Sequence, residues 1–118
     1  MSEPIVQYKY LVRKPGSSYR QLFVKDRWVR ARTLYGMYMS AEEPRTVEEI
    51  AADYEIPVEA VRESIEWCQG DPPELRRDMA REEAIMEASG MNGPAYKLTG
   101  NRRVLTPVDW AEIDRRFP

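Results

Sequence analysis

The feature that most constrains the fold of this 118-residue chain is a pair of helix signals between residues 46 and 68. Thr46 followed by Glu49 forms a capping box, and apolar residues then recur at helical spacing as far as Tyr54. Pro57 separates this first helix from a second one that reaches Cys68, because the residue before a proline avoids the helical conformation. Two helices joined by about three residues are typical of a helix-turn-helix.

A small antiparallel sheet is expected before this helix pair. The first strand alternates with a period of two, which places Val12 on its apolar face and Leu11 on the other face. A hairpin tip is predicted at Lys25 and Asp26, and Trp28 follows it as a large packing residue. We expect strands at residues 5–12, 19–24 and 27–30, and a largely apolar helix at residues 31–39.

The C-terminal third predicts a long charged helix and a short extension. Asp71 begins the long helix and Gly90 ends it. In the extension, Thr106 and Asp109 cap a last helix. A hairpin is predicted from strands at residues 96–98 and 103–105.

The predicted fold is therefore α+β, with a helix-turn-helix or winged-helix-like core, a small N-terminal antiparallel sheet and a C-terminal hairpin-helix extension. We expect residues 1–90 to form the main domain and residues 91–118 the extension.

The net charge of −2 is unevenly distributed along the chain. Residues 1–32 carry a net charge of +6, residues 33–89 a net charge of −10, and residues 90–118 a net charge of +2. Such an asymmetry indicates a polyanionic partner or a partner of complementary charge. The alternative is that both basic ends fold against the acidic middle.

Three segments resemble the domain-of-unknown-function 433 family. Tyr19–Gly36 is similar to the opening strands and first helix of that family. The run Pro44-Arg45-Thr46-Val47-Glu48-Glu49-Ile50-Ala51-Ala52-Asp53-Tyr54 resembles its next helix, and Ile56–Cys68 resembles the helix after that. Together these segments cover residues 19–70.

The resemblance implies a small helix-turn-helix or winged-helix-like domain. Members of the family are often antitoxin-like and resemble the VapB-type partners of PIN-domain ribonuclease toxins. The resemblance therefore implies a protein that dimerises, binds DNA and contacts a PIN-type toxin. The strand at residues 5–12 and the segment at residues 71–118 extend beyond the family pattern.

Two groups of basic residues are candidates for DNA contact. The second helix of the pair offers Arg62, but residues 45–67 carry a net charge of −5, whereas phosphate binding requires cations. The basic strand region is therefore favoured over base reading by this helix, and its alternative role is that of a solvated sheet face. The candidate nucleic-acid-binding residues are Arg13, Lys14, Arg20, Lys25, Arg27, Arg30, Arg32 and Arg62.

The C-terminal extension combines aromatic residues with arginines, which are common anchors of protein interfaces. In an antitoxin this segment would bind the toxin. The alternative is that it packs on its own domain or across a dimer. The candidate partner-binding residues are Tyr96, Arg102, Arg103, Trp110, Ile113, Arg115, Arg116 and Phe117.

Several classes of chemistry are disfavoured by what the chain lacks. It contains no His and a single Cys, which excludes Ser-His and Cys-His pairs, His metal ligands and an intrachain disulfide. We expect no catalytic residue, no metal and no cofactor. No signal peptide or membrane span is recognised, so a cytoplasmic location is expected.

The sequence predicts a non-enzymatic, antitoxin-like DNA-binding regulator that forms a homodimer. The alternative is an adaptor or assembly subunit that binds protein but not DNA.

Overall fold

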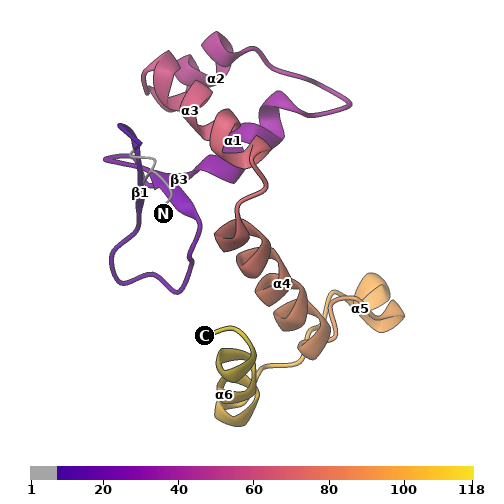
Figure 1. Cartoon of the computed structure of the whole chain (residues 1–118). Helices are drawn as coiled ribbons and strands as arrows, with labels where there is room; N and C mark the ends of the chain where they lie inside the picture. Colours follow the sequence, from indigo (N-terminus) through magenta and orange to yellow (C-terminus); the bar gives the residue numbers. More distant parts are fainter. Residues whose placement is uncertain (1–7) are drawn as a thin grey trace. The chain divides into compact units, whose positions relative to one another are not determined.

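The structure, a computed structural model, describes residues 8–118 (Figure 1). Within that range it is mixed α+β, with a three-stranded antiparallel sheet followed by six helices, which confirms the predicted fold class. The chain divides into two compact units, of which the first ends at Leu75 and the second spans Arg76–Pro118. The predicted boundary after residue 90 falls inside the second unit. The helix-turn-helix and the C-terminal extension thus belong to different units.

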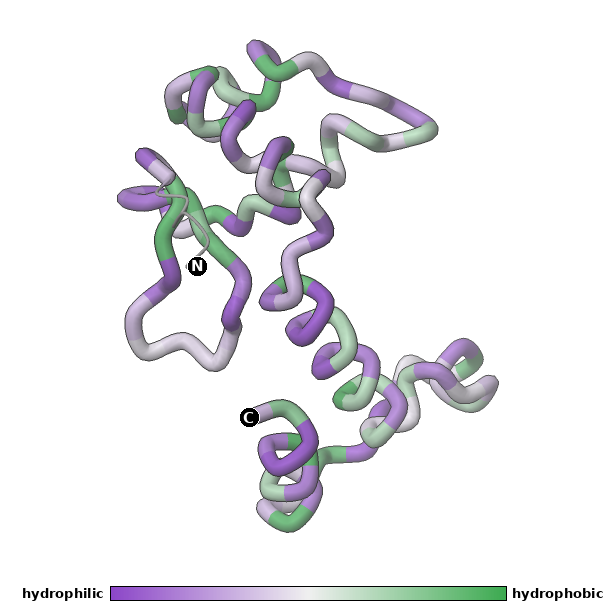
Figure 2. The backbone as a smooth tube through the Cα atoms, in the orientation of Figure 1, coloured by the Kyte–Doolittle hydropathy of each residue, from purple (hydrophilic) through white to green (hydrophobic). Residues whose placement is uncertain are grey.

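The sheet consists of β1 (Leu11–Arg13), β2 (Leu22–Val24) and β3 (Val29–Arg30), in that order. Leu11 pairs with Val24, and Val24 pairs with Val29, so these three side chains share the face that packs on the core. Figure 2 shows β1 and β2 as hydrophobic stretches separated by a more polar connection. The predicted facing of the first strand is wrong, since Leu11 is buried (4% exposed) and Val12 is only partly so. Packing on the helices decides which face of β1 is buried. The alternation of residues along the strand defines two faces but does not show which of them meets the helices. The predicted strand residues 5–7 lie outside the described part of the chain.

Three helices complete the first unit, and their apolar faces form one core. They are α1 (Ala31–Tyr38), α2 (Val47–Tyr54) and α3 (Val58–Gln69). Leu34 of α1, Ile50 of α2 and Val61 of α3 are completely buried. Burial of a side chain of this kind contributes about 1.5–3 kcal/mol, so this cluster accounts for much of the stability of the unit.

The helix-turn-helix signals of the sequence are confirmed in detail. The Thr46 side chain accepts a hydrogen bond from the Glu49 N–H, and Glu49 accepts one from the Thr46 N–H, both at 3.1 Å. Glu55 takes a left-handed conformation (φ +53°) that ends α2. Pro57 then caps α3, one position before the first turn in which it was expected. The connection is therefore as short as predicted.

The second unit contains most of α4 (Pro73–Ala88), together with α5 (Pro94–Thr99) and α6 (Pro107–Arg116). The predicted hairpin at residues 96–105 is wrong, because its first arm is helix α5 and its second arm forms no strand. Pro94 begins this helix, and Gly100 ends it in the left-handed conformation, donating its N–H to the Tyr96 carbonyl. Thr99 and Gly100 thus form the C-terminal end of α5. The predicted Thr106–Asp109 cap of α6 is confirmed.

Candidate nucleic-acid interface

The face of the sheet opposite the core carries cations over aromatic rings. Phe23 pairs with Val12 on one side and with Arg30 on the other, so these residues share that face. The Lys14 ammonium lies 5.6 Å from the centre of the Phe23 ring. The Arg30 guanidinium lies 5.6 Å from the centre of the Tyr19 ring, and the two rings are 6.2 Å apart. We name the side chains of Lys14, Tyr19, Phe23 and Arg30 the outer-face cluster.

Lys14 is the cation of this cluster that stands closest to solvent. Lys14 forms no ion pair with any residue in the range 8–118 and is exposed, so its charge is available to an anion. Phe23 is buried although it lies on the outer face, and the Tyr19 ring and the Lys14 ammonium both lie near its ring. Cations beside aromatic rings suit nucleic acid, in which phosphates and base faces alternate along the strand.

The turn between β2 and β3, residues 25–28, presents further charge. Lys25 and Arg27 are exposed there, as is Trp28. Arg27 forms an ion pair of 3.2 Å with Glu55, in the connection between α2 and α3. The contact joins two exposed side chains, so it is weak and open to competition from a phosphate.

The remaining basic candidates of the N-terminal region lie elsewhere in the first unit. Arg13 and Arg20 line a groove of about 420 Å³ whose other wall includes Trp67 and Glu74. Arg32 is half-buried on α1. Because Glu74 brings negative charge to the groove, it is less suited to phosphate than the outer face is. The structure thus brings together only part of the predicted basic set.

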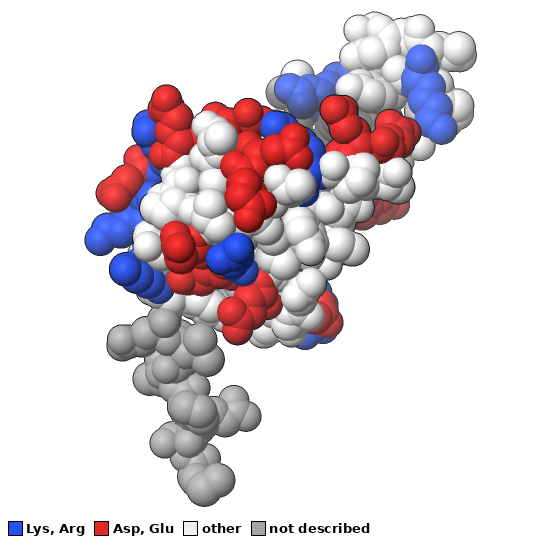
Figure 3. Space-filling model, turned by 90° about the horizontal axis from the view of Figure 1, so that it is seen from above, with Lys and Arg blue, Asp and Glu red and all other residues white. Residues whose placement is uncertain are grey.

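The second helix of the helix-turn-helix presents mainly carboxylates to solvent. On α3 the exposed charged side chains are Glu59, Arg62 and Glu66. Arg62 lies 3.7 Å from the Glu48 carboxylate of α2. Figure 3 shows carboxylates spread over the face of the molecule seen from above. Arg62 therefore sits in an acidic environment, which supports the sequence-based preference for the strand region.

In the second unit, several candidate partner-binding residues contact their own unit. Arg103 forms a 3.0 Å ion pair with Asp109 and donates to the Ala88 carbonyl. Ile113 is buried. The Arg81 guanidinium lies 5.9 Å from the centre of the Trp110 ring. These contacts fit the alternative in which the extension packs on its own unit.

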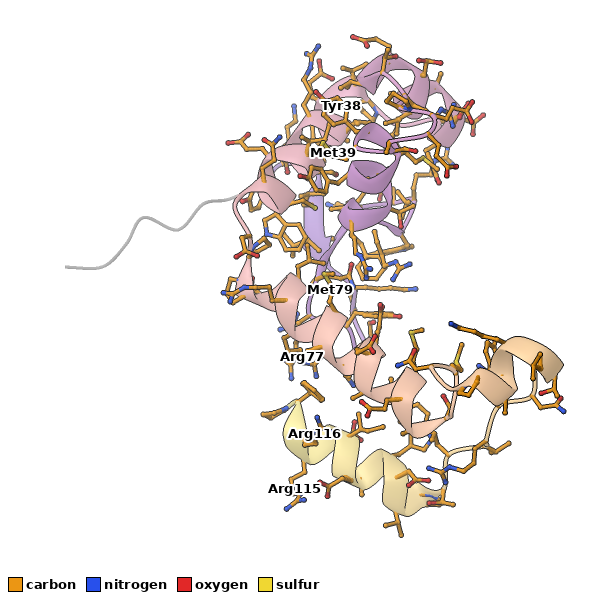
Figure 4. The ribbon with its side chains drawn as sticks, turned by 90° about the vertical axis from the view of Figure 1, so that its right-hand side faces the viewer. Tyr38, Met39, Arg77, Met79, Arg115 and Arg116 are labelled. Carbon is orange, nitrogen blue, oxygen red and sulfur yellow. The ribbon has the colours of Figure 1, made fainter. Side chains whose placement is uncertain are left out.

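The other candidates of this unit point to solvent or contact their own helix. Arg102 is exposed and forms no ion pair within residues 8–118. Arg115 pairs with Glu112 of the same helix and projects away from α4 (Figure 4). Arg116 lies over the ring of Phe117, its neighbour in sequence. Tyr96 is half-buried on α5.

The second unit leaves much apolar surface in solvent. Leu98 is 87% exposed and Val104 is 86% exposed, whereas Ala84 and Ile113 are its only buried apolar residues among those described. A cavity of about 270 Å³ lies beside Val104, Leu105 and Trp110. So small a core provides little stability to the unit.

The single thiol of the chain, that of Cys68, is buried at the end of α3. Burial raises the pKa of the Cys68 thiol to about 11, and the positive charge of Arg32 opposes this only in part. A thiol of this kind is a poor nucleophile at neutral pH. Among residues 8–118, no group of three or more acidic or Cys side chains is arranged to hold a metal ion.

The candidate residues from the sequence did not include the aromatic residues of this surface. Trp28 was taken as a packing residue, and Tyr19 and Phe23 only as parts of a strand, whereas Tyr19 and Phe23 lie under cations and Trp28 is exposed at a turn. The available signal was the interleaving of these rings with Lys14, Lys25 and Arg30.

The chain matches no known protein family, no curated protein and no solved structure in comparisons with each. None of the helices between residues 8 and 118 combines the length and the apolar character that crossing a bilayer requires.

Proposed function

We propose that this protein is a non-enzymatic, antitoxin-like regulator that binds nucleic acid through the outer face of its sheet and the turn at residues 25–28. The observation that carries the proposal is the outer-face cluster, in which Lys14 and Arg30 lie over aromatic rings. The regulator acts in the cytoplasm as a homodimer. Its membership of the domain-of-unknown-function 433 family is part of the same proposal and rests on the three similar segments.

The distribution of charge supports the sheet over helix α3 as the contact surface. Phosphate contacts supply most of the affinity of a non-specific complex, and each requires a cation. The sheet region offers Lys14 and Lys25 without ion pairs in the described residues. Helix α3 offers one arginine between exposed carboxylates. The helix-turn-helix then has a structural role, in which its helices pack against the sheet and support it.

A charge-neutralising variant tests this proposal. The double variant Lys14→Gln and Lys25→Gln removes two cations from the proposed surface. The matched control, Arg62→Gln with Lys97→Gln, causes the same change in net charge on α3 and α5. Both proteins are titrated with a labelled fragment of the protein's own promoter, as a duplex and as separated strands, at about 50 mM salt.

The proposal predicts that the Lys14 and Lys25 variant loses affinity and that the control retains it. Equal losses in the two variants would indicate a delocalised charge effect and contradict the assigned surface. Absence of binding to duplex and strands alike, with folded wild-type protein, would overturn the proposal.

A second candidate function is that of an adaptor or assembly subunit that binds a protein, such as a PIN-type nuclease toxin, through residues 76–118. The exposed Leu98 and Val104 favour it, because apolar side chains of this kind are normally covered in a stable unit. Purification from the source cell with nuclease treatment tests it. A specific protein partner lost on deletion of residues 91–118 would support the candidate, and an unchanged complex after that deletion would contradict it.

A further inference from the structure

Trp28 occupies an unusual position for a large aromatic residue. It lies at the end of the turn between β2 and β3, is 40% exposed, and has a left-handed backbone conformation with φ +54°. Asp26 of the same turn is also left-handed, with φ +73°. Asp tolerates this conformation, whereas a bulky side chain is strained in it. The turn would form more easily with Gly or Asn in place of Trp28.

The indole ring is not what closes the turn. The Trp28 backbone N–H donates to the Val24 carbonyl at 2.8 Å, which any residue other than proline could do. The two strands are then held by the pairing of Val24 with Val29 and of Phe23 with Arg30. The hairpin backbone thus accounts for the left-handed conformation but not for a bulky residue at this position, and strained residues of this kind gather at functional sites.

Basic residues lie close to Trp28 in the sequence. Lys25 and Arg27 precede it in the turn, on either side of Asp26, and Arg30 of the outer-face cluster follows two residues later. Arg27 is paired with Glu55. Lys25 forms no ion pair in the part of the chain that the structure describes. An exposed aromatic ring near basic residues is typical of surfaces that bind single-stranded nucleic acid, in which bases stack on aromatic side chains while cations contact the phosphates.

We propose that Trp28 stacks on an unpaired base, and that the ligand of the sheet is therefore single-stranded nucleic acid rather than an intact duplex. In a duplex both faces of each base are covered by its neighbours, so the indole has no base face to contact. The inference rests on the proposed nucleic-acid-binding function. It adds that the ligand is single-stranded and that Trp28 is the residue that favours single strands over a duplex. Stacking is independent of base identity, since every base has an aromatic face.

The experiment measures the binding of labelled oligonucleotides of about 12 residues to the full-length protein at about 50 mM salt. The oligonucleotides are oligo(dT), oligo(rU) and a mixed-sequence DNA duplex. Trp28→Leu removes the aromatic ring, and Trp28→Phe retains one. The matched control is Tyr38→Leu, which removes a comparably exposed aromatic ring (37%) from the end of α1, away from the sheet (Figure 4). Thermal unfolding of each variant confirms that it is folded.

The expected result is that the wild type binds at least one of the single strands more tightly than the duplex. Trp28→Leu should weaken single-strand binding by roughly 5- to 100-fold, whereas Trp28→Phe should restore most of it and Tyr38→Leu should leave it unchanged. Tighter binding of oligo(rU) than of oligo(dT), or the reverse, identifies RNA or DNA as the source of the unpaired base.

Two results would overturn the inference while leaving the proposed function intact. One is single-strand binding that is unchanged in Trp28→Leu but lost in the Lys14 and Lys25 double variant. The other is tighter binding of the duplex than of either single strand. Absence of binding to all three oligonucleotides would overturn the inference together with the proposed function. Loss of a protein complex in Trp28→Leu, with oligonucleotide binding unchanged, would assign Trp28 to a protein interface instead.

Discussion

The side chain of Glu63 on α3 accepts a hydrogen bond of 2.9 Å from the backbone N–H of Tyr10. The same oxygen accepts a second one, at 3.2 Å, from the N–H of Leu11 in β1. Among residues 8–118, β1 lies at one edge of the sheet, so no strand there supplies an acceptor on its outer side. One carboxylate thus attaches the edge of the sheet to the second helix of the helix-turn-helix.

Removing this carboxylate should loosen the sheet. We expect Glu63→Ala to lower the free energy of unfolding by about 1.5–3 kcal/mol, since hydrogen bonds to a charged group are lost and two N–H groups lose their acceptor. Glu63→Gln keeps one acceptor oxygen and should lose less. Urea denaturation measures both. Glu66→Ala, an exposed acid on the same helix, is the control and should change stability by no more than about 0.5 kcal/mol. Equal stability of Glu63→Ala and Glu66→Ala would contradict the assigned contact.

The cap of helix α6 should depend on pH. Hydrogen bonds from Arg103 and from Thr106 lower the pKa of Asp109 to about 2, from an ordinary value of 3.8. A group whose pKa is lower in the folded state stabilises that state above its unfolded pKa and loses this contribution as the pH falls through its folded pKa. Asp109→Asn should therefore be less stable than wild type above about pH 4, and the difference should shrink as the pH falls and be lost below about pH 2. Thermal unfolding followed by circular dichroism measures it. A difference that persists unchanged at pH 2 would rule out the ionised cap.

The Cys68 thiol should be unreactive in the folded protein. With a pKa of about 11, roughly one thiol in a thousand is ionised at pH 8, and the side chain is also buried. Alkylation by iodoacetamide, followed by mass spectrometry, should be slow in buffer and fast in urea. Fast modification of the native protein at pH 8 would contradict both the burial and the raised pKa.

Side chains of the second unit should differ sharply in their importance for folding. Ile113 is 3% exposed, so Ile113→Ala should destabilise α6 by about 2–4 kcal/mol. Leu98→Ala is the matched truncation at a site that is 87% exposed, and it should change stability by no more than about 0.5 kcal/mol. Limited proteolysis of the C-terminal region compares the two variants. Similar losses at both positions would show that α5 is packed as firmly as α6.

Local chemistry was sufficient to predict much of the first unit from the sequence. The Thr46–Glu49 capping box and the short connection before Pro57 fixed two helices to within a few residues. Both features act through neighbouring residues, so they require no knowledge of the rest of the fold. The same is true of the Thr106–Asp109 cap that begins α6.

Features that depend on tertiary contacts were less predictable. Leu11 was assigned to the wrong face of β1, because alternation defines two faces but not which one meets α3. Residues 96–98 were read as a strand, although Pro94 and Gly100 are suited to the two ends of a helix. The outer-face cluster depends on pairing between β2 and β3, which places Arg30 beside Phe23 and near Tyr19. No local pattern in the sequence specifies that arrangement.

The most direct test of the central claim is the salt dependence of nucleic-acid affinity for the wild type and for the Lys14→Gln and Lys25→Gln double variant. Each phosphate contact contributes about 0.7 to the slope of log K against log salt concentration for single strands, and about 0.9 for duplex DNA. If both lysines contact phosphates, the slope for single strands should become shallower by about 1.4 in the double variant and stay at the wild-type value in the Arg62→Gln and Lys97→Gln control. An unchanged slope in the double variant, or an equal change in the control, would contradict binding through the outer face of the sheet.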